Sequence, residues 1–389
     1  MRPMRDFDYY MPTKIRFGPG VSSKVGEELR ALGGKRVLVV TDAGIVRAKL
    51  LEDIAASLDK AGISHLVFDE VEANATISKV LKGSELQKKM ECDILLSIGG
   101  GSVMDAAKAI GILATNPGPL TDYEGPEKYD NPPLPTVAVA TTAGTGSEVS
   151  FGAVVFDEER CYKLSIRSAM QIPKVAFLDP LLLKTTPPRL AAATGMDALS
   201  HALEAYVSQS STFITDALCR ENFHLVGRYL RRFVADPSDT EAAGAMLQAS
   251  SMGAMAFNTA RLGIVHAMAH PLGARFSLHH GVACGILLPH AMRFNLMACP
   301  QRYIDVAVGL EGYVQGHLEM GRACCAVEAV ERLLADTGVQ VDFSSTEITE
   351  ELLSTLSDET LSSGMQRTNP RAVTKEDVMN IFRLLFQKG

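Results

Sequence analysis

The segment GIVHAMAHPLGARFSLHHG carries four of the nine histidines in the chain: His266, His270, His279 and His280. An imidazole has two polar nitrogens, and each needs a partner when the ring is buried. A packed apolar core has no use for so many of them in one short segment. The concentration therefore favours a metal site or a proton-transfer site.

The spacing of these histidines limits how they can act together. His266 and His270 lie four residues apart, so they share one face of a predicted helix, which Pro271 and Gly273 are expected to end. His280 would lie about 21 Å from His266 if that helix were continuous. The two can share a metal only if the chain turns back between them. Spacing alone leaves open which of the four histidines bind.

A second segment, TGMDALSHALEAY (194–206), places Asp197 and His201 four residues apart on a predicted helix. A carboxylate and an imidazole on one helix face can hold a divalent cation, although a solvated pair has the same spacing. With three of the histidines above, Asp197 would complete a site of one carboxylate and three imidazoles.

Two loops are rich in glycine and hydroxyl groups. SIGGGSVMDAAKAIG (97–111) places three glycines and Ser102 between a predicted strand and a predicted helix, where free backbone amides suit a phosphate. The GxGxxG spacing is absent, and Ser102 as a helix cap with Asp105 completing a capping box is the structural alternative. ATTAGTGSEVS (140–150) follows another apolar run, and two such loops in one sheet suggest a nucleotide crevice.

Asp42 closes the apolar run RVLVVT. A carboxylate there could accept hydrogen bonds from an adenosine ribose and would repel a 2′-phosphate. The alternative is an aspartate that serves only the turn.

The elements that must position these residues change along the chain. Short apolar runs predict strands at 36–41, 64–68, 93–98, 136–140 and 174–178, with helical segments between them. This alternation predicts a parallel sheet covered on both faces. Beyond the Pro187–Pro188 pair the sequence becomes helical throughout. We therefore predict an α/β dinucleotide-binding domain over 1–186 and an all-helical metal-binding domain over 187–389.

Composition excludes several classes of partner. The 389-residue chain is 47% hydrophobic and 21% charged, with a formal net charge of −7 and no basic block, which argues against nucleic acid and anionic membranes. It has no apolar run long enough to span a bilayer and no signal-peptide pattern at its start. Seven cysteines without a CxxC pair predict a reduced, cytoplasmic protein.

Together these motifs resemble the iron-containing (group III) alcohol dehydrogenase family, which includes lactaldehyde reductase and propanediol and butanol dehydrogenases. The resemblance covers nearly the whole chain, and its matching elements are FGPG, GGGSVMDAAK, TTAGTGSE, GMDALSHALEAY, the histidine segment, ILLPH and NPR. It implies an active site in the cleft between the two domains.

The resemblance implies a role for some of the histidines. On the family pattern, Asp197, His201, His266 and His280 bind one divalent metal, usually Fe²⁺, although these ligand types suit Zn²⁺ and Mn²⁺ equally. His270 is then the catalytic residue that relays the alcohol proton. His279 and His290 receive no role.

The resemblance also implies binding residues for NAD, which Asp42 should favour over NADP. These are Asp42, Asn74, Gly99, Gly100, Gly101, Ser102, Asp105, Thr141, Thr142, Thr145 and Lys163. Asn74 and Thr76 stand in an Asn-Ala-Thr stretch where the family has Asn-Pro-Thr. By the same pattern the substrate pocket is formed by Phe151, Gly152, Phe257, Leu262, Met365 and Arg367.

The predicted function is hydride transfer between NAD(H) and a small primary alcohol or aldehyde, in a homo-oligomer of two or more chains. Arg261, Arg275 and Arg367 extend this prediction to an aldehyde that carries an anionic group, because guanidinium groups pair with carboxylate, phosphonate or sulfonate oxygens. Solvated or helix-bridging arginines are the alternative.

Four other functions are weighed against this one. A zinc glycerol dehydrogenase and a dehydroquinate-synthase-like lyase are disfavoured by the ALxHAxE pattern and by the spacing between His266 and His280. A metal-free enzyme similar to maleylacetate reductase is disfavoured by the intact ligand set. A non-catalytic nucleotide or metal sensor is disfavoured by His270.

Overall fold

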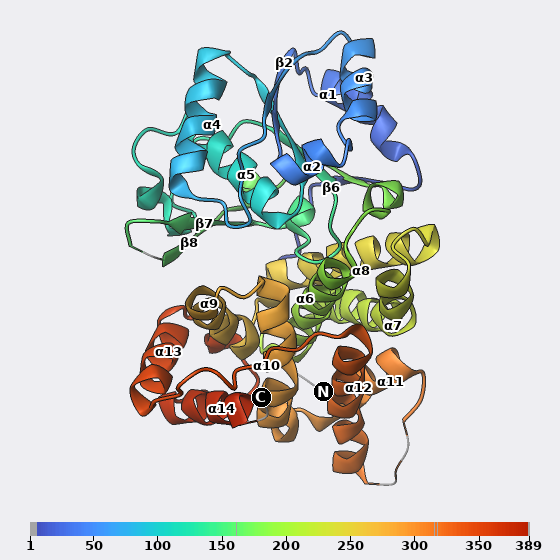
Figure 1. Ribbon diagram of the computed structural model, residues 1–389, viewed down its shortest axis with the longest axis vertical. Helices are drawn as coiled ribbons and strands as arrows, with labels where there is room; N and C mark the ends of the chain where they lie inside the picture. Colours follow the sequence, from blue (N-terminus) through green and yellow to red (C-terminus); the bar gives the residue numbers. More distant parts are fainter. Residues whose placement is uncertain (1–5, 161, 315, 317, 388–389) are drawn as a thin grey trace. The chain divides into compact units, whose positions relative to one another are not determined.

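The computed structural model describes residues 6–160, 162–314, 316 and 318–387 (Figure 1). The chain forms two compact units. One is an α/β unit over 11–185, and the other is a helical unit from residue 186 onward. Residues 6–10 belong to the helical unit, although the sequence placed them with the α/β domain. Phe7 accounts for this, because its ring packs edge-on against Phe213 at a centroid distance of 5.4 Å.

The α/β unit contains a six-stranded sheet in which every neighbouring pair is parallel. The five predicted strands are confirmed, and a sixth, β1, lies at the edge, where a short and largely exposed KIRF segment is hard to find from hydrophobicity. In spatial order the strands are β1 (Lys14–Phe17), β9 (Val175–Leu178), β6 (Thr136–Ala140), β4 (Ile94–Gly99), β2 (Arg36–Val40) and β3 (Ser64–Phe68).

Helices cover both faces of this sheet, as Figure 1 shows for α4 and α5 on one side of β2 and for α1 and α3 on the other. Alternate residues of β2 face opposite ways: Leu38 and Val40 join one core, and Val37 and Val39 join the other. Burial on both faces explains why the strand reads as one apolar run. The helices are α1 (Val25–Ala31), α2 (Ala43–Arg47), α3 (Glu52–Lys60), α4 (Ile77–Lys89) and α5 (Gly101–Thr115).

A second sheet of three strands was not predicted. It consists of β5 (Gly125–Pro126), β8 (Tyr162–Arg167) and β7 (Gly152–Asp157), and the last two are antiparallel. In β7 every second residue is buried, so only half of its side chains contribute to a hydrophobic signal. Short 3₁₀ turns complete the unit: η1 (Val21–Lys24), η2 (Leu120–Tyr123), η3 (Ser147–Val149), η4 (Ala169–Gln171) and η5 (Pro180–Leu183).

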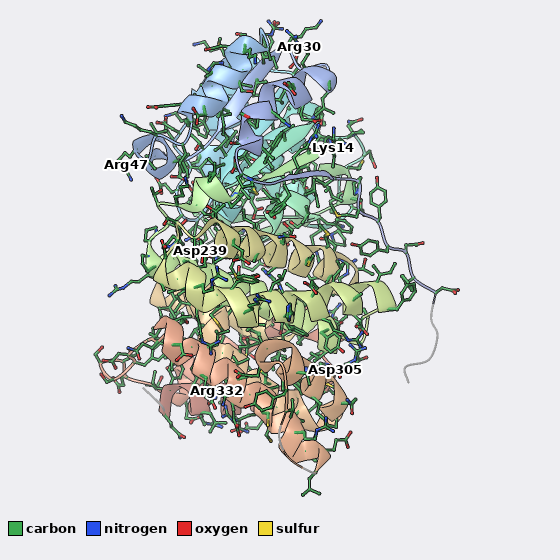
Figure 2. The ribbon with its side chains drawn as sticks, turned by 90° about the vertical axis from the view of Figure 1, so that its right-hand side faces the viewer. Lys14, Arg30, Arg47, Asp239, Asp305 and Arg332 are labelled. Atoms are coloured by element: carbon green, nitrogen blue, oxygen red, sulfur yellow. The ribbon has the colours of Figure 1, made fainter. Side chains whose placement is uncertain are left out.

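The helical unit begins with α6 (Pro188–Val207), whose first turn contains Pro188 at a position that tolerates proline because no helical hydrogen bond is lost there. Asp239, which is labelled in Figure 2, caps α8 (Thr240–Ala260) by accepting a hydrogen bond from the backbone amide of Ala242. None of the described helices is long and apolar enough to cross a membrane.

The helices of this unit are α6 (Pro188–Val207), α7 (Phe213–Ala235), α8 (Thr240–Ala260), α9 (Ile264–Phe276), α10 (His280–Asn295), α11 (Pro300–Glu311), α12 (Glu319–Thr337), α13 (Glu350–Ser362) and α14 (Lys375–Gln387), with 3₁₀ turns η6 (Leu296–Ala298) and η7 (Met365–Thr368).

The expected end of the histidine helix was wrong. Pro271 lies inside α9, which continues to Phe276 and ends where Ser277 adopts a left-handed conformation with φ of 52°. Proline costs a helix one hydrogen bond, but residues on both sides of it are buried here, and their packing retains the helical path. The chain then reverses before α10 begins at His280, so the required turn exists but comes later than predicted.

Candidate metal and nucleotide sites

In the helical unit, three imidazoles from three helices converge on one carboxylate oxygen. Asp197 and His201 lie one turn apart on α6, His266 lies on α9, and His280 is the first residue of α10. The Oδ1 atom of Asp197 lies 3.9, 3.8 and 3.7 Å from the Nε2 atoms of His201, His266 and His280 respectively. The structure thus brings together all four predicted ligands.

These distances are too long for hydrogen bonds. They are close to the separation of two ligands on one metal, which is roughly 3.4 Å for a tetrahedral site with bonds of about 2.1 Å. Asp197 Oδ1 and His266 Nε2 are both buried, and neither has a hydrogen-bond partner among the described residues. Leaving such atoms unpaired is costly, and one cation would satisfy both of them. The donor set therefore fits a divalent metal ion.

The electrostatic interactions within this cluster favour the charged forms of both Asp197 and His266. Burial alone would raise the pKa of Asp197, but the neighbouring His201, His280 and His266 outweigh it and lower that pKa. For His266, burial favours the neutral ring, yet nearby Cys284, Asp197 and Glu204 raise its pKa well above the ordinary value. The surroundings of both groups therefore favour positive charge next to the carboxylate of Asp197.

Glu204 lies beside this cluster and was not among the site residues predicted from the sequence. Its Oε2 accepts a hydrogen bond from His266 Nδ1 at 2.7 Å, so Nε2 of the same ring is left to face Asp197. The backbone amides of Gly263 and Val265 also donate to this carboxylate, at 2.9 and 2.5 Å. Such a carboxylate fixes the tautomer and the orientation of a ligating histidine. Its position seven residues after Asp197, on the same face of α6, could have revealed it.

Two of the other histidines have distinct positions. His270 lies one turn after His266, with its ring centroid 5.4 Å from that of His280, so it stands beside the cluster. His279 caps α10, because its Nδ1 accepts a hydrogen bond from the amide of Gly281 at 3.2 Å. A structural task thus explains His279, to which no chemical role was assigned.

In the α/β unit, the predicted nucleotide-binding segments follow adjacent strands. Asp42 follows β2, Gly100 follows β4 and Thr141 follows β6, and these three strands are neighbours in the sheet. The sheet order reverses between β2 and β4, and ligands of open α/β sheets bind at the carboxyl ends of strands around such a point. Gly99 ends β4, and its carbonyl accepts a hydrogen bond from the amide of Thr141 at 3.1 Å.

The glycines of the first loop allow the second loop to approach. A Cβ atom on Gly101 would lie 2.7 Å from Cγ2 of Thr145, and one on Gly100 would lie 3.1 Å from Oγ1 of Thr142. The first separation is closer than two such atoms tolerate. Loop-to-loop packing thus requires glycine at position 101, whereas a side chain at position 100 would only have to displace Thr142 slightly.

The capping-box interpretation of this loop was wrong. Gly100 is the N-cap of α5, and the hydroxyl of Ser102 instead donates to the carbonyl of Ala73 at 2.6 Å. This bond ties the loop to the segment in which Asn74 is exposed and Thr76 caps α4.

Asp105 faces the second loop rather than its own helix end. It accepts hydrogen bonds from the hydroxyl of Ser147 at 2.7 Å and from the amide of Val154 at 3.0 Å. Burial raises the pKa of Asp105. The positive charge of Lys108 opposes that rise, and the charge of Lys163 on β8 opposes it more weakly.

Lys108 was also missed by the sequence analysis. Its side chain is fully buried in α5, and its ammonium donates to the hydroxyl of Ser147 at 2.7 Å and to the carbonyl of Gly152 at 2.8 Å. Burial lowers the pKa of Lys108 to about 8, although Asp105 and Glu148 oppose this. Lys108 therefore connects α5, the second loop and the start of β7.

Asp42 has a structural task of its own. It is the N-cap of α2, and its Oδ1 accepts hydrogen bonds from the amides of Gly44 at 2.7 Å and Ile45 at 3.0 Å. The turn interpretation is thus correct for one oxygen. Contact with a ribose stays a prediction.

Comparison with known proteins agrees with these features. Residues 12–180 match the family model for iron-containing alcohol dehydrogenase, and residues 191–386 match that for the C-terminal part of the Fe-containing alcohol dehydrogenase family. The chain belongs to the iron-containing alcohol dehydrogenase family. The predictions of family, fold class and oxidoreductase function are confirmed.

Individual members of the iron-containing alcohol dehydrogenase family match along their whole lengths. A 1,3-propanediol dehydrogenase of Citrobacter freundii is 41% identical over 98% of this chain and 99% of its own. A crystal structure of 1,3-propanediol oxidoreductase gives a TM-score of 0.95 at 40% identity, covering 98% of this chain and all of the other. A sulfoacetaldehyde reductase from Bifidobacterium kashiwanohense, in complex with NAD⁺, gives 0.90 at 29% identity, covering 99% and 100%.

The predicted substrate residues of this family member fall into two groups. Phe257 packs against His201 at a ring-centroid distance of 4.8 Å, so it borders the metal cluster. The carbonyl of Leu262 accepts a hydrogen bond from Thr368 at 2.6 Å, which ties it to the turn η7 that also contains Met365 and Arg367. The second group, Phe151 and Gly152, belongs to the α/β unit. Arg261, Arg275 and Arg367 are all exposed.

Proposed function

We propose that this protein is a metal- and NAD(H)-dependent oxidoreductase that transfers a hydride between the nicotinamide and a small primary alcohol or aldehyde. The observation that carries this proposal is the convergence of three imidazole Nε2 atoms on the buried Oδ1 of Asp197, within 3.9 Å. The donor types suit Fe²⁺, Zn²⁺ and Mn²⁺, and the family favours Fe²⁺.

The residues divide the chemistry between them. A bound metal supplies Lewis acidity toward the substrate oxygen, and the nicotinamide carries the hydride. Asp197, His201, His266 and His280 would hold the metal, and Glu204 orients His266. Three neutral imidazoles and one carboxylate leave a divalent site with net positive charge, which favours an alkoxide over an alcohol.

His270 is proposed to accept the proton that the alcohol releases and to pass it to solvent. It is partly exposed, and its ring lies 5.4 Å from that of His280. We expect His270→Ala to keep its metal while kcat falls about 100-fold, because a positioned acid–base group contributes roughly 10²–10⁴. His224→Ala, which removes an exposed histidine of α7, is the control and should keep both metal and kcat. Metal loss from His270→Ala would make that residue a ligand instead.

NAD(H) is the proposed cofactor, bound by the loops after β2, β4 and β6. The proposal is supported by Asp42, whose charge disfavours a 2′-phosphate. It is also supported by the relative that was crystallised with NAD⁺.

The central experiment measures NADH oxidation with a panel of short aldehydes. The protein is stripped with a chelator and reloaded anaerobically with Fe²⁺, Zn²⁺ or Mn²⁺. Turnover should vanish on stripping and return with Fe²⁺. Full activity in protein that elemental analysis shows to be metal-free would refute the proposal.

An aldehyde with an anionic group is a second candidate substrate. It is supported by the exposed Arg367, which lies on the turn tied to Leu262, and by the sulfoacetaldehyde reductase among the relatives. Arg367→Ala should raise KM for such an aldehyde and leave KM for propanal unchanged, whereas Arg228→Ala, an exposed change on α7, is the control. Equal effects on both aldehydes would contradict it.

We also propose a cytoplasmic homo-oligomer of two or more chains. None of the six cysteines that the structure describes forms a disulfide, which suits a reducing compartment. Light scattering of the purified protein would test the oligomeric state, and a monomer would exclude it.

A further inference from the structure

A sulfur atom lies beside the proposed metal ligands. Cys284 is fully buried on α10, one turn after His280, and its Sγ lies 3.6 Å from Nε2 of that histidine. Single donor atoms of Asp197, His266, His280 and Cys284 all lie within 4.8 Å of one another. Because no role followed from its sequence context, Cys284 was not among the predicted site residues.

The thiol is not an isolated feature. Asp197 Oδ1 and His266 Nε2, both buried and without a hydrogen-bond partner among the described residues, belong to the same group of atoms. One cation would satisfy both of these atoms, and Cys284 Sγ lies within 4.8 Å of each of them. Cys219 is equally buried on α7 but belongs to no such group within the described part of the chain, so burial alone does not bring a thiol to such a place.

We propose that Cys284 Sγ joins Asp197, His201, His266 and His280 as a fifth donor of this metal site, so that a thiophilic divalent cation is held by sulfur as well as by nitrogen and oxygen. The inference rests on the proposed metal site. When the cation binds, the S–H bond breaks, a metal–sulfur bond forms, the proton passes to solvent, and no electron is transferred. Thiolate is a soft ligand, so this site should favour Zn²⁺ and Co²⁺ over Fe²⁺ more than a site of imidazoles and carboxylate alone.

Cobalt substitution tests the proposal without relying on turnover. Stripped full-length protein is titrated anaerobically with Co²⁺, whose visible ligand-field bands report binding and whose near-ultraviolet sulfur-to-cobalt charge-transfer band reports a Co–S bond. We expect both in the unmodified protein. Cys284→Ser should lose the charge-transfer band, and Cys219→Ser, the buried control, should keep it.

The outcomes separate this inference from the function on which it rests. Bound Co²⁺ without a charge-transfer band in the unmodified protein would overturn the role of Cys284 and leave the metal site standing. No Co²⁺ binding at all would overturn both. If Cys284→Ser does not fold, X-ray absorption of the unmodified zinc form decides: a Zn–S distance of about 2.3 Å supports the proposal, and a shell of nitrogen and oxygen alone overturns it.

Discussion

The two units build their candidate sites in different ways. In the helical unit the chemistry resides in side chains: one carboxylate and three imidazoles from α6, α9 and α10 meet at a buried point. In the α/β unit it resides in backbone and hydroxyl groups of loops that follow three adjacent strands. A side-chain site should fail when one donor is removed. A backbone site should weaken by degrees, because no single group supplies most of the binding.

The largest expected effect is that of Asp197→Asn. The amide keeps the shape of the carboxylate but not its charge, at the atom on which the three imidazoles converge. We expect loss of bound metal and a fall in kcat/KM of about 10³-fold, equivalent to ~4 kcal/mol of transition-state stabilisation. Asp239→Asn, a capping carboxylate in the same unit, is the control. Normal metal content in Asp197→Asn would contradict the side-chain description of this site.

Removing the charge of Glu204 should have a smaller effect. Glu204→Gln keeps an acceptor for His266 Nδ1 but weakens the bond that orients the ring. Supporting carboxylates of this kind contribute about 10- to 100-fold in metal affinity, which competition with a chromophoric chelator would measure. Glu241→Gln, an exposed change on α8, is the control and should leave the metal affinity unchanged. Unchanged affinity would show that packing alone holds His266.

Gly101→Ala tests the α/β unit. The added methyl group would meet Thr145 Cγ2 at 2.7 Å, so the two loops must separate. We expect KM for NADH to rise about 10-fold, a change of ~1.4 kcal/mol, with metal content unchanged. Thr145→Ser removes the clashing atom and should restore part of the loss. Gly321→Ala adds a methyl group that meets nothing within 4 Å and serves as the control.

Asp42→Ser separates the two tasks of that residue. Serine still caps α2 but carries no charge. The preference for NADH over NADPH, measured as the ratio of kcat/KM values, should narrow by a few-fold while thermal stability is retained. Equal kcat/KM values for NADH and NADPH in the unmodified protein would contradict the idea that the charge of Asp42 disfavours NADPH.

The smallest effect is one of pH on the metal-free protein. The pKa of His266 is raised above its ordinary value of 6.5, so its protonation contributes stability that is complete below that pH and is lost as pH rises through the raised pKa. On the proposed function, a bound metal would take the place of this proton. The difference in Tm between metal-loaded and metal-free protein should therefore widen by a few degrees as pH rises above neutrality. A constant difference would mean that His266 does not exchange a proton for the metal.

By itself the sequence determined the types of the donors and the elements that carry them. Apolar runs identified five strands of the main sheet, because strands buried on both faces have a continuous signal. The spacing of Asp197 and His201 placed both on one helix face, and the histidine motif identified the family. These are local properties, set by residues a few positions apart.

The tertiary structure decided which distant atoms meet. Pro271 did not end α9, because burial of the residues around it outweighs the loss of one hydrogen bond. Only the packing of α6, α9 and α10 brings Glu204 to His266, and Cys284 to Asp197 and His266. Likewise, Lys108 has its role because α5 packs beneath the second loop and β7. Such contacts depend on how helices and strands pack against one another, and helical or strand periodicity carries no information about that.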